Sequence, residues 1–225
     1  MASKSGPALP APERQEIDHR TIKLIVGVIS LTLPILTKAF AEPPLTSISA
    51  SYYSTGPAQS IFVGYLFATS AFLLAYNGRS RTEMVLSKVA AAAALGVALF
   101  PCNCADTTEQ SSPVHWVSAA SMFVILTYFC YKFRQRALDR NHFEAKIRAA
   151  IYLICGIAML VSIAVLGADA LSHRWLTHRV SDLVFWGETV SLIAFGVSWL
   201  TASRVLPLLT RSDERFSPFK ERNPA

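Results

Sequence analysis

The stretch Ile61-Phe-Val-Gly-Tyr-Leu-Phe-Ala-Thr-Ser-Ala-Phe-Leu-Leu-Ala-Tyr76 contains no charged residue. A helix of about 20 predominantly apolar residues crosses the hydrocarbon core of a bilayer. In a soluble protein, a helix without a polar face must be covered on every side, and that takes a much larger protein than a chain of 225 residues. This stretch is therefore predicted to be a transmembrane helix.

Five further apolar runs have a similar length, and the composition agrees with them. Hydrophobic residues make up 52% of the chain and charged residues only 16%, whereas roughly a quarter of a soluble domain is charged. The predicted fold is all-α: a polytopic membrane protein with a six-transmembrane-helix bundle. Residues 1–20 and 207–225 are expected to be flexible polar tails. The predicted helices cover residues 22–41, 61–77, 84–101, 116–133, 149–168 and 183–206.

The run at 84–101 is the least hydrophobic, because Ala90 to Ala94 are five consecutive alanines. Small side chains allow backbones to approach closely, so this helix is expected to be surrounded by other helices. The first run ends at Ala39-Phe40-Ala41, which resembles a signal-peptide cleavage site. Its length of about 20 apolar residues exceeds the 7 to 15 of a signal core, so we expect it to be retained.

The distribution of Lys and Arg predicts the orientation. Of the 21 basic residues, 18 lie in or beside the two tails and the loops after the second and fourth runs. The other three are Lys38, Arg174 and Arg179. Basic residues concentrate on the cytoplasmic side of membrane proteins, so both termini are predicted to be cytoplasmic. The same bias explains the net charge of +6, with anionic lipid headgroups as neighbours and no nucleic acid as partner.

No sequence motif indicates a cofactor, a metal site or a soluble type of catalysis. A glycine-rich phosphate loop, a Gly-x-Ser-x-Gly elbow and a His-Glu-x-x-His motif are all missing from the sequence. Cys130 and Cys155 fall inside predicted helices and are expected to be small core residues. Cys102 and Cys104 lie on the non-cytoplasmic side, where oxidation is possible, although a Cys-x-Cys disulfide closes only with strain. We expect no cofactor, and an enzyme is the less favoured alternative.

Two ionisable residues on the non-cytoplasmic side are candidates for a site. Glu188 lies about five residues into the sixth helix, roughly 7 to 8 Å below its start. A carboxylate at that depth is costly and is expected to face the bundle interior with a partner. His115 opens the fourth helix on the same side, with Ser118 at helical spacing from it. If these helices are neighbours, His115 can pair with Glu188, and the pair either fixes helix packing or serves a ligand or a proton.

The large aromatic residues fall mostly near the predicted helix ends. An aromatic belt at the membrane interface is the simplest interpretation. The four tryptophans that it would include are Trp116, Trp175, Trp186 and Trp199.

Several strings resemble an uncharacterised bacterial family of six-transmembrane membrane proteins over residues 45–204. They include Ser47-Ile-Ser-Ala-Ser-Tyr-Tyr53, Phe62-Val-Gly-Tyr-Leu-Phe67, Val114-His-Trp-Val-Ser-Ala119 and Ala194-Phe-Gly-Val-Ser-Trp-Leu200. The chain is more remotely similar to the FRAG/DRAM/SFK family, which includes damage-regulated autophagy modulators and a Golgi factor in lipid remodelling of GPI anchors. That family has a Ser-rich first outer loop, a His opening helix four and a Glu in the last helix. It carries Asp where this chain has Ala50.

The resemblance implies a lipid-linked role in a multi-pass protein of the bacterial inner (plasma) membrane, with membrane lipids as partners. It also leaves room for a homo-oligomer or another membrane protein partner. The leading hypothesis is a non-cytoplasmic cavity that binds a lipid headgroup or lipid-like ligand. The alternatives are a membrane-embedded lipid hydrolase or acyltransferase, with His115 or Glu188 as base, and a small transporter. The expected ligand-binding residues are Ser49, Tyr52, Tyr53, His115, Ser118 and Glu188.

Overall fold

A computed structural model describes residues 18–42, 44–100, 102, 113–172 and 174–217. Within them it contains six α-helices, two short 3-10 helices and no strand. All six α-helices are long and apolar enough to cross a membrane, so the predicted all-α fold with six helices of membrane-spanning length is confirmed. The elements are α1 (His19–Phe40), η1 (Ser49–Tyr53), α2 (Pro57–Ala75), α3 (Arg81–Leu99), α4 (Pro113–Leu138), α5 (Phe143–Leu171), α6 (Leu183–Ser203) and η2 (Pro207–Leu209).

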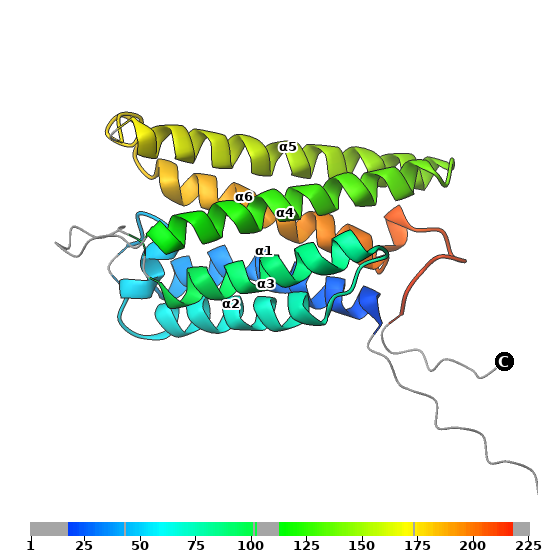
Figure 1. Ribbon diagram of the computed structural model, residues 1–225, viewed down its shortest axis with the longest axis horizontal. Coiled ribbons are helices and arrows are strands. Elements are labelled where there is room, and N and C mark those ends of the chain that lie inside the picture. The colour runs from blue at the N-terminus through cyan, green and yellow to red at the C-terminus, as the bar shows by residue number, and fades with distance from the viewer. Residues whose placement is uncertain (1–17, 43, 101, 103–112, 173, 218–225) are drawn as a thin grey trace, which may run out of the picture.

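The helices form a closed ring in chain order. Each helix packs against the helix before and after it, and α6 closes the ring by packing on α1 (Figure 1). Because six helices alternate in direction, both ends of the described chain lie at the same end of the bundle, where Arg20 Nη1 lies 3.4 Å from the carbonyl oxygen of Glu214. We call this the basic end. The opposite end, which carries loops 41–56 and 172–182, is the loop end.

Polar side chains fix the start of each helix that begins at the basic end. Asp18 accepts a hydrogen bond from the backbone N–H of Arg20 (2.8 Å) before α1, and Ser80 accepts one from Glu83 (3.2 Å) before α3. His142 Nδ1 accepts one from Ala145 (3.2 Å) at the start of α5. The first N–H groups of a helix lack partners within it, so these side chains define where the helices begin.

Glycines bring α1 and α6 into backbone contact. A Cβ atom added to Gly27 would lie 2.9 Å from the backbone N of Leu200 and 3.1 Å from the carbonyl oxygen of Gly196. In α3, four of the five consecutive alanines are buried, with Ala90 and Ala94 at 0% exposure. These alanines face the neighbouring helices α2 and α4. However, α3 is not surrounded by helices as expected, because Val85, Val89 and Leu99 on it are exposed. Small residues let membrane helices pack closely, where dispersion contacts stabilise the bundle.

The side chains divide the helices into an inner and an outer surface. Ile35, Val117 and Ile154 are about two-thirds exposed, at 65%, 64% and 66%, on faces that point away from the ring. Inside the ring, an aromatic cluster surrounds Trp199, whose ring centroid lies 5.3 Å from that of Tyr76 and 5.4 Å from that of Phe195. Trp199 is completely buried, so its assignment to an interfacial belt was wrong. A tryptophan near a helix end points into or out of the bundle according to the face of the helix that carries it. Which face is inward depends on the neighbouring helices, and the sequence does not give these.

The helix boundaries differ most from prediction at the basic end. There α4 extends to Leu138 and α5 begins at Phe143, so both helices continue through polar residues beyond the apolar runs. Residues 207–217, expected as part of a flexible tail, lie against the bundle in the structure. Thr210 is buried there, and Glu214 forms ion pairs with arginines of three segments. Arg140 and Arg148 are 74 and 66 residues from Glu214 in sequence, which is why composition alone did not indicate the contact.

Candidate functional site

Glu188 on α6 is the carboxylate that ties the first long loop to the bundle. Its Oε2 accepts hydrogen bonds from the backbone N–H groups of Ile48 (2.5 Å) and Ser49 (3.2 Å). Its Oε1 accepts one from the Ser49 hydroxyl (2.7 Å). The expectation that Glu188 faces inward with a partner is confirmed. The partner is the loop that leads into η1, 140 residues away in sequence.

Among the described residues, this arrangement satisfies the Glu188 carboxylate by hydrogen bonds and without a counter-ion. Three donors converge on the two oxygens, and hydrogen bonds to a charged acceptor are stronger than neutral ones. The same contact satisfies two backbone N–H groups that would otherwise be buried without an acceptor, since Ile48 and Ser49 are 2% and 8% exposed. Glu188 and the loop therefore stabilise each other.

Beneath this contact lies a cavity of about 130 Å³, which we call the bundle cavity. Its lining is mostly apolar and comes from α1, α2, α3, α4, α5 and α6, with Leu33, Phe62 and Val97 among the residues. Its lining includes the polar residues Ser49, His115, Glu188 and Ser191. The structure thus brings three of the six predicted ligand-binding residues to one cavity.

His115 does not form the predicted pair with Glu188. Its Nδ1 lies 2.8 Å from the carbonyl oxygen of Phe100, the residue that follows α3. Since a carbonyl only accepts, the ring nitrogen donates in this contact. The last carbonyls of a helix have no partner within it, so His115 supplies a donor to the end of α3. The pairing depended on α4 and α6 being neighbours, whereas α4 packs chiefly against α3 and α5, and His115 bonds to the end of α3.

The other three predicted residues do not line the bundle cavity. The Tyr53 hydroxyl donates to the carbonyl oxygen of Cys102 (2.8 Å), and the rings of Tyr52 and Tyr53 pack edge to face. Ser118 lies against Gly96, where an added Cβ would come 2.2 Å from its oxygen. These residues join the first long loop to the end of α3, and α4 to α3.

The described cysteines differ in oxidation state. Cys102 is buried and disulfide-bonded, although strain was expected to oppose a Cys-x-Cys disulfide. Cys104 lies outside the described residues. Cys130 and Cys155 are free and buried in the bundle, as expected for small core residues.

A second cavity of about 510 Å³ adjoins the bundle cavity at the loop end; we call it the loop cavity. Trp116 and Leu166 line both cavities. The loop cavity combines apolar residues with polar and charged ones, among them Ser47, Asp169 and Arg174. Sequence reasoning did not identify it, because its walls come from loop 41–56, α4, α5, the loop before α6 and the start of α6.

Asp169 organises the wall of the loop cavity. It accepts hydrogen bonds from the backbone N–H groups of Leu176 (2.7 Å) and Thr177 (3.2 Å), and a third from the Thr177 hydroxyl. Asp169 is 3% exposed, so these contacts fold the loop after α5 back onto the end of that helix. The only sequence signal for this role was an acidic residue at the end of a long apolar run.

The geometry is suited to binding more than to catalysis. The Ser49 hydroxyl lies within reach of the Glu188 carboxylate, as a nucleophile and base require. However, the N–H groups of Ile48 and Ser49, which would be needed to stabilise an oxyanion, already bind that carboxylate. Among the described residues, no group of three His, Cys, Asp or Glu side chains is placed to hold a metal ion.

Comparison with known proteins adds no assignment to this geometry. No protein-family model matches the chain, and no curated protein or solved structure matches it either.

Proposed function

We propose that this chain is a multi-pass protein of the inner membrane, with both termini cytoplasmic, that binds a lipid or lipid-like amphiphile at its loop end. The orientation rests on the sequence, in which 18 of 21 basic residues lie in or beside the two tails and the loops after the second and fourth apolar runs. The resemblance to the bacterial six-helix family and, remotely, to the FRAG/DRAM/SFK family favours a lipid-linked role. A reporter enzyme fused after Arg222 tests the orientation, since activity on the non-cytoplasmic side would refute it.

The observation that carries the proposal is the pair of adjoining cavities. Ligand pockets usually measure about 300 to 1,000 Å³ and are mostly apolar with a few placed polar groups. The loop cavity has that size and carries charged and hydroxyl groups suited to a headgroup. The bundle cavity continues beneath it with an apolar lining suited to the start of an acyl chain. A molecule with a polar and an apolar part matches both.

A hydrolase or acyltransferase is the second candidate, favoured by the 2.7 Å contact between Ser49 and Glu188. It requires Ile48 and Ser49 to release their N–H groups from the carboxylate when substrate binds. Lipid turnover that disappears in Ser49→Ala would support this candidate over simple binding. No comparable feature supports a transporter.

The experiment is to purify the full chain in mild detergent and identify retained lipid by native mass spectrometry. Ala119 lines the bundle cavity, so Ala119→Phe should fill it and abolish retention. Ala164 is exposed on α5 and lines neither cavity, so Ala164→Phe is the matched control. Wild type and the control should each retain about one lipid per chain.

Two results would contradict lipid binding at this site. One is a wild-type protein that carries no lipid through purification while folded. The other is equal loss of lipid in Ala119→Phe and Ala164→Phe, because it would place the lipid on the outer surface of the bundle.

A further inference from the structure

A third cavity, at the basic end, has a different character from the two at the loop end. It measures about 200 Å³ and opens between the starts of α1 and α5, the turn between α2 and α3, and the ends of α4 and α6. We call it the basic cavity. Six cationic side chains line it: Arg20, Lys23, Arg79, Arg136, Arg148 and Arg204.

Carboxylates neutralise only part of this charge. Glu83 pairs with Arg136, and Glu214 pairs with Arg148 (3.1 Å) and Arg204 (3.2 Å). Asp18 is the one acidic residue in the described lining. Six cations thus face three carboxylates, which leaves the cavity electropositive.

Lys23 contacts only aromatic rings in this cavity among the described residues. Its Nζ lies 5.4 Å from the ring centroid of Tyr76 and 4.9 Å from that of Phe133, in cation–π contact with both. Within the described part of the chain, this ammonium has no hydrogen bond or ion pair. An ammonium has three donors, and holding it between aromatic rings without an acceptor is unfavourable. An anion in the cavity would supply acceptors.

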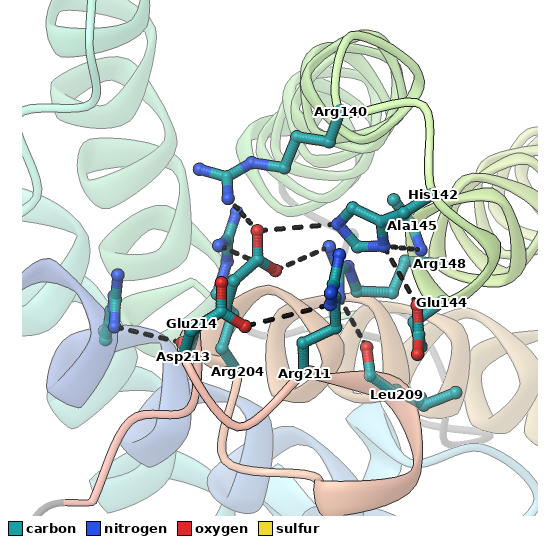
Figure 2. A network of polar contacts seen from close by, with 11 residues as sticks. Arg140, His142, Glu144, Ala145, Arg148, Arg204, Leu209, Arg211, Asp213 and Glu214 are labelled. Atoms are coloured by element: carbon teal, nitrogen blue, oxygen red, sulfur yellow. Dashed lines mark hydrogen bonds and ion pairs between the residues drawn. The ribbon is translucent and has the colours of Figure 1, made fainter.

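The C-terminal segment shows that these arginines converge on an anion. Figure 2 shows Arg140, His142, Arg148 and Arg204 directed at Glu214. Arg148 also donates to the carbonyl oxygen of Leu209 (2.5 Å). Glu214 therefore holds Arg148 and Arg204 from one side, while both line the basic cavity.

The titration of Arg204, which follows the last residue of α6, agrees with an electropositive setting. Burial lowers the pKa of its guanidinium to about 10, and the cations Arg140, Arg148 and Arg20 lower this pKa further. The group stays charged at neutral pH. A bound anion would relieve the repulsion among these cations.

We propose that the basic cavity binds a phosphate group, either the phosphomonoester headgroup of a membrane lipid or a free phosphate. Arginine forks and a lysine point charge are the groups that recognise phosphate oxygens in proteins. About 200 Å³ is below the usual range for whole cofactors, so a headgroup fits better than a nucleotide. Lys23 is the fifth residue of α1, roughly 6 Å along the helix, which is near the level of lipid headgroups.

The test uses the full chain and two probes. Inorganic phosphate is titrated calorimetrically into detergent-purified protein without added lipid. Separately, the protein is placed in phosphatidylcholine nanodiscs with a minor share of phosphatidate, and retained phosphatidate is measured by native mass spectrometry. Phosphate binding without lipid assigns the site to the free anion, whereas retention of phosphatidate alone assigns it to a headgroup. Either result supports the proposal.

Lys23→Gln removes an ammonium that has no ion pair among the described residues. It should weaken binding of whichever probe the wild type binds at least tenfold. Lys38→Gln is the matched control, because Lys38 lies on the same helix in cation–π contact with Phe185 (5.0 Å) at the loop end. Arg79 is exposed, and its side chain forms no ion pair with the described residues. Arg79→Gln should therefore fold like wild type, and it too should weaken binding.

The proposal is overturned if neither probe binds the wild type, or if Lys38→Gln loses as much binding as Lys23→Gln. It is also overturned if Arg79→Gln melts like wild type and binds with unchanged affinity. Because the site lies at the end of the bundle opposite the loop and bundle cavities, these results do not depend on lipid binding there.

Discussion

Removing the Glu188 carboxylate should release the first long loop from the bundle. In Glu188→Ala, the N–H groups of Ile48 and Ser49 lose their acceptor while they remain in a buried setting. Each buried, unsatisfied donor costs about 1 to 3 kcal/mol, so the two together should lower the free energy of unfolding by about 2 to 6 kcal/mol.

Glu188→Gln separates the shape of this contact from its charge. The amide oxygen can accept both N–H groups, and the amide nitrogen can donate to the Ser49 hydroxyl, which then becomes the acceptor. The weaker neutral hydrogen bonds are offset by the lower cost of burying an uncharged group. We therefore expect the free energy of unfolding of Glu188→Gln to lie within about 1 kcal/mol of wild type.

The assay combines denaturant titration in detergent with hydrogen exchange of the backbone amides at residues 48 and 49. Glu42 lies exposed in the same loop, and its side chain makes no hydrogen bond with the described residues, so Glu42→Ala is the control. The reasoning is refuted if Glu188→Ala costs less than about 1 kcal/mol and leaves the exchange rates of both amides unchanged.

Two further predictions concern helix packing and oxidation. Gly27→Ala should lower the free energy of unfolding by about 1 to 3 kcal/mol, because the added methyl meets α6 backbone atoms that cannot rotate away. Gly64→Ala, where nothing lies within 4 Å, should be neutral or slightly stabilising in the same titration, and equal losses would contradict the packing argument. When the denatured protein is treated with a maleimide, Cys130 and Cys155 should react at once and Cys102 only after reduction. Labelling of Cys102 without reductant, detected by peptide mass spectrometry, would show that no disulfide is present.

The sequence predicted the helices well because each span depends on a local property. A run of about 20 apolar residues has one stable arrangement in a bilayer, since the backbone must satisfy its hydrogen bonds within the segment. The helix from Leu183 therefore begins where its apolar run begins. The helix ends were harder to predict, because charged residues beyond an apolar run can also be helical. At the basic end α4 and α5 therefore extend beyond their predicted boundaries.

The candidate site was only partly predictable. Glu188 stood out because a carboxylate within an apolar run needs a partner, but any polar group at the same depth could have supplied it. Ser49 was predicted as a ligand-binding residue because it lies in the Ser-rich first outer loop, and His115 because it opens the fourth helix on the same side as Glu188. The structure brings both to the bundle cavity. The pairing of His115 with Glu188 failed because sequence spacing does not determine which helices are neighbours.

The sequence alone determined that this chain forms six helices long and apolar enough to cross a membrane, because hydrophobic run length and helix number are one-dimensional properties. Only the tertiary structure decided what each buried charge contacts. The bond from Ile48 to Glu188 spans 140 residues, and the ion pair between Arg148 and Glu214 spans 66. Such contacts depend on the order and rotation of helices in the closed ring. That packing creates the two cavities at the loop end and gathers the cations of the basic cavity, where Lys23 lacks an acceptor among the described residues.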